Sequence, residues 1–204
     1  MKLTLHEIQS GMILEAEDFS VTAFPVWPRG PDCFGYVFTE KTRRPFLPEK
    51  AEALAIPAGP WRRDLVAGKE VTLPDGRVIQ PDEVLGAERQ GTRLVHIGDV
   101  GRTNELVENC RDADTLVMES TYLTEEADMA RRFAHMTARD AAELARAANV
   151  KHLILTHISR RYRERDVAAE AQAIFPNTIV ARDFDAYQVR RNECVRIKIE
   201  SPEE

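Results

Sequence analysis

From residue 93 onward the chain alternates short apolar runs with helical segments, and this alternation constrains the fold more than any other feature. The runs RLVHI (93–97), TLVM (115–118) and KHLIL (151–155) have the length and apolar content of strands buried on both faces. Two further runs, NTIVA and DAYQVR, follow near the end of the chain. Strands that alternate with helices predict an α/β domain built in layers.

The segments between these strands carry signals for the start and the end of helices. Thr137 followed by Asp140 predicts the N-terminus of a long helix, which should stop at Asn149. The segment TNELVENC is expected to begin a helix at Thr103. A further helix is expected over ERDVAAEAQAIF, and it should end at Pro176-Asn177. The predicted helices therefore fall between the predicted strands, as a layered α/β domain requires.

The first ninety residues have a different texture. GMILEAEDFSVTAFPVW (11–27) and CFGYVF (33–38) read as strands, because they are rich in aromatic and β-branched residues. Six prolines then divide residues 41–92 into short segments, which include a helix over EKAEALAI and a hairpin that turns at Asp75-Gly76. This part is expected to be an inserted arm.

Charge and apolar content limit the classes of function. A net charge of −6 argues against a protein that is attracted to nucleic acid over its whole surface. Residues 41–70 nevertheless hold seven basic against four acidic side chains, and four arginines gather between 160 and 165. Either cluster could neutralise phosphates or be ordinary solvated surface charge.

The chain is expected to be cytoplasmic and without a membrane anchor. No apolar run approaches the ~18 residues of a membrane span, and the N-terminus is acidic where a signal peptide would be basic and then apolar. Three widely spaced cysteines are predicted to be reduced thiols, because they fit neither a disulfide framework nor a zinc knuckle.

Three polar residues of catalytic type follow the three predicted buried strands: Asp99, Glu119 and His157. Sites assemble at the carboxyl ends of strands in open α/β sheets, so these side chains are expected to lie together. His135, at the entry to the long helix, belongs to the same rim. Taken singly, such an Asp is more often a turn residue and such a His more often a structural one, so the combination carries the prediction.

Several segments together resemble the ribonuclease Z family, whose members are zinc-dependent endonucleases that trim tRNA 3′ ends. The similar segments occur in family order and at family-like spacing. They are IGDVGRTNEL (97–106), MESTYL (118–123), AHMTARDAAELA (134–145) and LILTHISRRY (153–162), with SVTAFPVWPRGPDCFGYVFTEK and IPAGPWRRDLVAGKEVTLPDGRVIQPDEVLG upstream.

The resemblance implies the C-terminal half of a metallo-β-lactamase-type αββα sandwich. That half domain would comprise residues 1–38 and 91–204, and residues 39–90 would form an exosite-like arm that binds tRNA. Two zinc ions would hold and activate the hydroxide that attacks a phosphodiester.

By the same resemblance, individual residues acquire expected roles. Asp99 would bridge both zinc ions and His157 would bind one of them. His135 would stabilise or protonate the leaving oxygen, and Glu119 would orient it. Candidates for contact with RNA are Arg62, Arg63 and Lys69 in the arm and Arg161 after the third strand.

The departures from the family pattern matter as much as the matches. The first metal motif, H-x-H-x-D-H, is absent, and Arg29 stands where the family has another histidine ligand. Arginine offers no lone pair and would repel a zinc ion. The isolated chain is therefore expected to bind metal weakly and to be inactive. Smaller departures are Val100, Met118 and Met136, where Thr, His and Ser are usual.

Several hypotheses remain open from the sequence. The leading one is a truncated or split ribonuclease Z-family polypeptide that acts on precursor tRNA, with a complementing N-terminal half or a homodimer partner covering its exposed sheet. The second is a non-catalytic RNA-binding or regulatory subunit. A third is a degenerating gene product without activity, and another hydrolase of the metallo-β-lactamase fold remains conceivable for the core alone.

Overall fold

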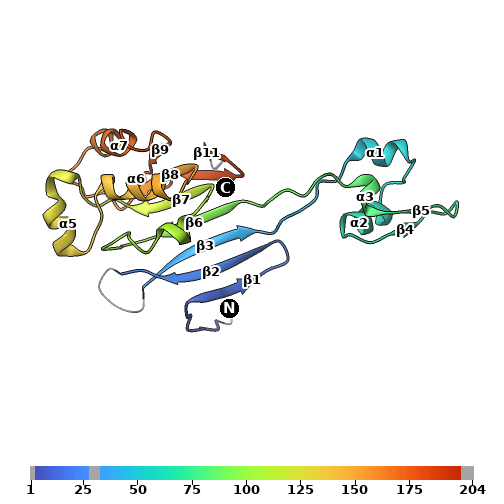
Figure 1. The fold of residues 1–204 in the computed structure, drawn as a ribbon, viewed down its shortest axis with the longest axis horizontal. Helices are drawn as coiled ribbons and strands as arrows, with labels where there is room; N and C mark the ends of the chain where they lie inside the picture. Colours follow the sequence, from blue (N-terminus) through green and yellow to red (C-terminus); the bar gives the residue numbers. More distant parts are fainter. Residues whose placement is uncertain (1–2, 28–32, 199–204) are drawn as a thin grey trace, which may run out of the picture. The chain divides into compact units, whose positions relative to one another are not determined.

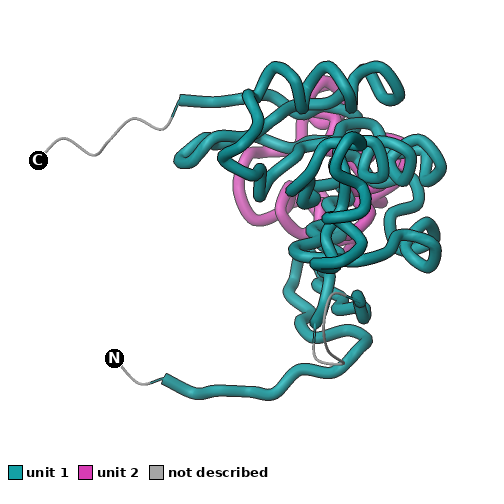
Figure 2. Tube along the Cα trace, turned by 90° about the vertical axis from the view of Figure 1, so that its left-hand side faces the viewer, with its two compact units in different colours: residues 1–40, 92–204 teal, residues 41–91 magenta. Residues whose placement is uncertain are grey.

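The computed structural model describes residues 3–27 and 33–198, which divide into two compact units (Figures 1 and 2). Unit 1 contains residues 1–40 and 92–204, and unit 2 is Lys41–Gly91. Within unit 1, the Glu40 amide donates to the Thr92 carbonyl at 2.9 Å, and the Thr92 amide donates to Glu40 Oε2 at 3.0 Å. These bonds hold together the two points of unit 1 between which unit 2 is inserted.

A seven-stranded mixed sheet forms the centre of unit 1, in the order β1-β2-β3-β6-β7-β8-β9. Strands β1 to β6 in this order pair antiparallel, whereas β6, β7, β8 and β9 are parallel. The predicted layered α/β class is thereby confirmed. The strands are β1 (Gly11–Glu15), β2 (Phe19–Pro25), β3 (Phe34–Glu40), β6 (Arg93–Ile97), β7 (Thr115–Glu119), β8 (His152–Thr156) and β9 (Thr178–Val180).

Helices lie beside the parallel part of this sheet, and the two longest contact strands β7, β8 and β9 (Figure 1). They are α4 (Val107–Cys110), a 3-10 turn η1 (Thr124–Glu126), α5 (Ala127–Phe133), α6 (Ala138–Ala147) and α7 (Glu164–Gln172). The strands contribute Val95, Leu116 and Leu153 to the core, and α6 contributes small residues such as Ala141 and Ala145. Alanines on the inner face of α6 allow its backbone to approach the sheet closely.

The helix signals in the sequence were only partly correct. Thr137 caps α6 as predicted, in a capping box with Asp140, and Asn149 ends the helix in a left-handed conformation with φ 55°. The predicted helix start at Thr103 is wrong, because α4 begins only at Val107. Residues 103–106 form a turn instead, and this turn brings Leu106 into the core with 3% of its surface exposed.

The opposite face of the sheet is partly exposed. Phe38 lies opposite both Val21 and Leu94 on this face, and its side chain is 39% exposed. At the sheet edge, Met12 and Leu14 of β1 are 61% and 48% exposed. Unit 1 therefore presents an apolar face and an unpaired strand edge among its described residues.

A hairpin of β10 (Ala186–Arg190) and β11 (Glu193–Ile197) also belongs to unit 1, and a buried carboxylate links it to the start of β6. Asp114 accepts the backbone N–H groups of Arg93 at 2.8 Å and Asn192 at 2.7 Å. Its side chain is fully buried. These bonds anchor the start of β6 and the hairpin turn to the same point.

Unit 2 has a small core of its own. It comprises α1 (Pro48–Ala53), α2 (Pro60–Val66), β4 (Val71–Thr72), β5 (Val78–Ile79) and α3 (Pro81–Val84). Ile56, Leu65 and Val84 are almost fully buried in it. The predicted helix over 49–56 and the hairpin at Asp75-Gly76 are confirmed, and Gly76 supplies the positive φ of 85° that this turn requires.

All three cysteines have free thiols, as predicted. Burial raises the pKa of the Cys110 thiol to about 12, so this thiol stays protonated and unreactive. Within the described ranges, none of the helices combines the length and the apolar content needed to cross a membrane.

Candidate metal centre

The polar residues expected at the strand ends do meet at one edge of the sheet. Asp99 lies two residues after β6, Glu119 is the last residue of β7, and His157 follows β8 directly. Parallel pairing places Glu119 opposite Thr156, so the carboxyl ends of β7 and β8 are level. His157 adopts φ 53°, a left-handed conformation that turns the chain sharply after the strand.

His135 joins this group through the junction of α5 and α6. Helix α5 ends at Ala134 in a left-handed conformation with φ 57°, and His135 follows it. The backbone of Tyr122 then pairs with the segment around Thr137, since the Tyr122 amide donates to the Met136 carbonyl and the Tyr122 carbonyl accepts from the Ala138 amide. This short parallel bridge places His135 beside Glu119.

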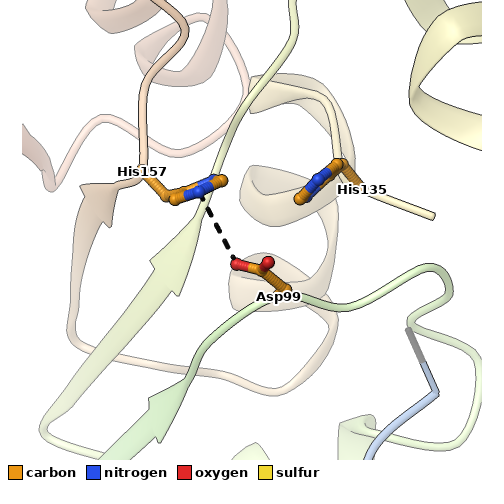
Figure 3. A group of neighbouring side chains, drawn as sticks. All are labelled: Asp99, His135 and His157. Atoms are coloured by element: carbon orange, nitrogen blue, oxygen red, sulfur yellow. Dashed lines mark ion pairs between the residues drawn. The ribbon is translucent and has the colours of Figure 1, made fainter. Parts of the chain in front are cut away.

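Three side chains form a compact group of potential metal ligands (Figure 3). Asp99, His135 and His157 each offer one ligand atom, and these atoms lie within 4.8 Å of one another. His157 Nε2 is 3.8 Å from Asp99 Oδ1, which is an ion-pair distance and too long for a hydrogen bond. The two imidazole rings stack with centroids 5.2 Å apart.

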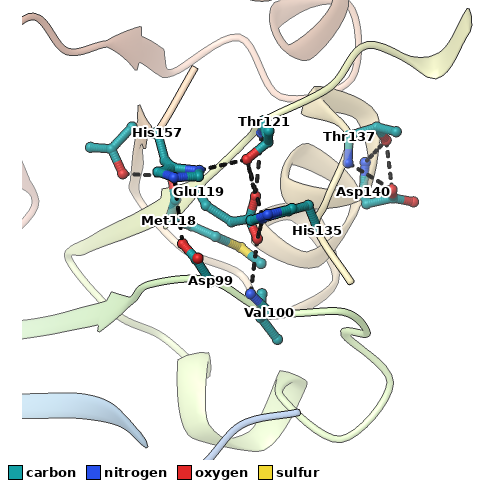
Figure 4. Close-up of polar contacts among 10 residues, drawn as sticks. Asp99, Val100, Met118, Glu119, Thr121, His135, Thr137, Asp140 and His157 are labelled. Carbon is teal, nitrogen blue, oxygen red and sulfur yellow. Dashed lines mark hydrogen bonds and ion pairs between the residues drawn. The ribbon is translucent and has the colours of Figure 1, made fainter. Parts of the chain in front are cut away.

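Glu119 lies behind this group and joins its segments (Figure 4). Its side chain is fully buried. Oε1 accepts from the Val100 amide at 2.8 Å and contacts His135 Nδ1 at 2.9 Å, while Oε2 accepts from the Thr121 hydroxyl at 2.6 Å. A single carboxylate therefore fixes the turn that carries Asp99, the ring of His135 and the side chain of Thr121.

Sequence reasoning did not single out Thr121. Its hydroxyl lies 2.6 Å from His157 Nδ1 and 3.3 Å from His135 Nδ1. A lone threonine carries no motif signal, and this one matters only because the sheet brings Glu119 and His157 to either side of it. The clue in the sequence was its position two residues after Glu119, at a strand end.

The donor set fits a divalent transition metal such as zinc. Two imidazoles and one carboxylate are zinc ligands, and catalytic zinc sites use three protein ligands. Two atoms bound at about 2.0 Å to a tetrahedral zinc lie roughly 3.3 Å apart, so the ligand atoms would have to approach one another by up to about 1.5 Å to hold one ion.

Comparisons with known proteins agree with this arrangement. A sequence profile described as "Beta-lactamase superfamily domain" matches residues 75–158. "Ribonuclease Z" from Bradyrhizobium diazoefficiens is 44% identical over 178 residues, which cover 87% of this chain and 59% of the relative. "Ribonuclease Z" from Methanothermobacter thermautotrophicus is 39% identical over 189 residues, which cover 92% and 61%.

The chain is a ribonuclease Z homologue of the metallo-β-lactamase superfamily. It spans about 60% of the length of the curated relatives it matches. The metallo-β-lactamase fold protein YhfI from Bacillus subtilis aligns with a TM-score of 0.54, covering 88% of this chain and 52% of YhfI. At 16% identity this likeness concerns the fold alone, which is α/β and metallo-β-lactamase-like with a mixed sheet.

The small departures from the ribonuclease Z pattern lie in the apolar core. Val100 and Met118 are fully buried, and Met136 is 5% exposed. All three belong to the main hydrophobic cluster of unit 1. Apolar side chains are therefore well accommodated where the family usually has Thr, His and Ser. Arg29, which replaces a family histidine, lies outside the described residues.

The predicted RNA-contacting residues belong to both units, three to unit 2 and one to unit 1. In unit 2, Arg62 donates from Nε and Nη2 to the Ile56 carbonyl, at 3.1 and 2.7 Å, while Arg63 and Lys69 are exposed. In unit 1, Arg161 pairs with Glu126 at 2.8 Å. The guanidinium of Arg62 thus has a structural bond to its own unit, and the contact of these four residues with RNA stays a prediction.

Proposed function

We propose that this chain supplies part of the active site of a zinc-dependent endoribonuclease that processes tRNA 3′ ends. The observation that carries the proposal is the group of Asp99, His135 and His157, held by the buried Glu119 at the carboxyl edge of β6, β7 and β8 in a ribonuclease Z homologue. The remaining metal ligands would come from a polypeptide segment that carries the H-x-H-x-D-H motif.

The roles of the side chains follow from their chemistry. Asp99 and His157 would hold zinc, which when bound lowers the pKa of water and offsets negative charge on a phosphate. His135 keeps Nε2 free, because its Nδ1 is engaged by Glu119, and Nε2 would carry a proton to the leaving oxygen. Since the ligand atom of His135 lies within 4.8 Å of the other two, a third metal ligand is its alternative role.

For unit 2 we propose the role of the tRNA-binding exosite arm inserted into the half domain. Arg63 and Lys69 are exposed on it and would meet the phosphate backbone, whereas Arg62 is partly engaged by Ile56. Reversing the charge in Arg63→Glu and Lys69→Glu should weaken binding of precursor tRNA and reduce its salt dependence. Lys50→Glu, an equal charge change at another exposed site of unit 2, is the matched control. Equal loss in all three variants would contradict a specific phosphate contact.

We further propose that a complementing N-terminal half covers the exposed face of unit 1 and completes the αββα sandwich. Supporting this, Phe19 and Phe38 are 37% and 39% exposed, β1 is the terminal strand of the sheet, and the chain covers only about 60% of its relatives. Apolar faces and free strand edges of this kind bind other polypeptides. Light scattering that detects a homodimer of the chain alone would contradict the proposal that an N-terminal half covers this face.

Cleavage of a 3′-extended tRNA precursor tests the catalytic role. We expect cleavage when the chain is mixed with the N-terminal segment of a ribonuclease Z relative. His135→Ala should reduce the rate by roughly two to four orders of magnitude, as loss of a general acid does. His6→Ala is the matched control, since His6 is exposed and precedes β1, outside the site, and its loss should leave the rate unchanged. A complex that forms but does not cleave would overturn the proposal.

A non-catalytic RNA-binding subunit is the second candidate. Arg29 favours it, because an arginine in place of a histidine ligand reduces the ability to hold metal. Binding of precursor tRNA that is insensitive to chelators, together with no cleavage in the mixture, would support this candidate over the first.

A further inference from the structure

The hydroxyl of Thr121 occupies a position that the proposed catalytic roles do not use. It lies between Glu119 Oε2 and His157 Nδ1, at 2.6 Å from each (Figure 4). Thr121 is 8% exposed, so water does not compete freely for these contacts. The neighbouring hydroxyl of Ser120 is also buried, yet it has no hydrogen-bond partner among the described residues.

The direction of these hydrogen bonds follows from counting protons. A threonine hydroxyl has one proton to donate and two lone pairs to accept with. Thr121 donates its single hydroxyl proton to Glu119 Oε2, which also accepts from the Thr121 amide at 3.3 Å. The contact with His157 must then run the other way, with Nδ1–H of His157 donating to Thr121 Oγ1. A neutral imidazole protonated on Nδ1 has its lone pair on Nε2.

We infer that Thr121 is a positioning residue for His157. Because Thr121 donates its proton to Glu119, its oxygen accepts from Nδ1–H of His157, and this keeps the Nε2 lone pair of His157 toward Asp99. Nε2 of His157 lies 3.8 Å from Asp99 Oδ1, so its lone pair is on the Asp99 side of the ring. That this lone pair would bind a metal ion rests on the proposed function, in which His157 is a zinc ligand. Groups that fix the tautomer of a ligand histidine typically change metal affinity 10–100-fold.

The two histidines are fixed by separable contacts, which makes the inference testable. His135 Nδ1 contacts Glu119 directly at 2.9 Å and Thr121 only at 3.3 Å. His157 reaches the carboxylate only through Thr121. Without the Thr121 hydroxyl, the proton of His157 should therefore no longer be held on Nδ1, whereas the proton of His135 should stay on Nδ1.

The experiment is ¹⁵N NMR of the histidine rings in the metal-free full chain at about pH 8, above the usual histidine pKa of about 6.5. In the unaltered chain both rings should show a protonated Nδ1 and an unprotonated Nε2. In Thr121→Val the proton of His157 should move to Nε2 in a large part of the molecules, with His135 unchanged. Thr121→Ser should restore the original pattern, and Ser120→Ala should not disturb it.

The outcomes separate this inference from the proposed function. A protonated Nε2 on His157 in the unaltered chain, or a Thr121→Val variant with an unchanged His157 ring, would overturn the inference. If Thr121→Val fails to fold by circular dichroism, the unaltered chain and Thr121→Ser still decide the question. A chain with the expected tautomer but no affinity for zinc would contradict the proposed function and leave the inference standing.

Discussion

At the scale of single residues, Glu119 carries the arrangement of the site. It is fully buried and receives hydrogen bonds from three parts of the chain. In Glu119→Gln an amide nitrogen replaces one acceptor oxygen and faces donors, so the free energy of unfolding should fall by about 2 kcal/mol. Urea denaturation measures this loss. Glu143→Gln, on the exposed side of α6, should change it by less than about 0.5 kcal/mol, and equal effects would contradict the role of Glu119.

The residues of the site were predictable from the sequence to different degrees. Asp99, Glu119 and His157 follow apolar strands, and the rule that strand ends share one edge was sufficient to group them. The contacts of Thr121 were not predictable, because they depend on two strands and a tight turn at His157. The sequence indicates which strand ends meet, and only the folded chain decides which hydroxyl lies between them.

At the scale of elements, the capping of α6 positions His135 and contributes to stability. The Thr137 hydroxyl accepts from the Asp140 amide, and the Asp140 carboxylate accepts from the Thr137 amide. Thr137→Ala should lower the free energy of unfolding by about 1 kcal/mol, as loss of an N-cap does. Thr103→Ala is the matched control, since Thr103 resembles a cap in the sequence but starts no helix. A larger loss in Thr103→Ala would contradict this assignment of the caps.

Elements were predicted best where one physical signal dominates. Strands β6, β7 and β8 were placed to within about a residue, because short apolar runs separated by helical segments mark such strands. Helix α2 was missed because Gly59 and Pro60 resemble a loop, although Pro60 occupies the first helical position, where proline costs no hydrogen bond. Helix α4 is short because burial of Leu106 outweighs the weak cap signal of Thr103.

At the scale of the whole molecule, the insertion of unit 2 predicts that unit 1 folds without it. Glu40 and Thr92 are already hydrogen-bonded within unit 1, so a short Gly-Ser linker can replace residues 41–91. The shortened chain should keep a cooperative thermal transition and a dispersed NMR spectrum, and it should lose binding of precursor tRNA. Collapse of unit 1 in this variant would contradict the division into two units.

We propose that Asp99, His135 and His157 form part of a metal centre that a second polypeptide segment completes. Elemental analysis for zinc tests it most directly, on the chain alone and on its purified complex with the N-terminal segment of a ribonuclease Z relative. We expect stoichiometric zinc in the complex, little in the chain alone, and loss of zinc from the complex in Asp99→Asn and His157→Ala but not in His6→Ala. A stable complex without zinc, or one whose zinc content is unchanged by the Asp99 and His157 substitutions, would show that these residues do not form a metal centre.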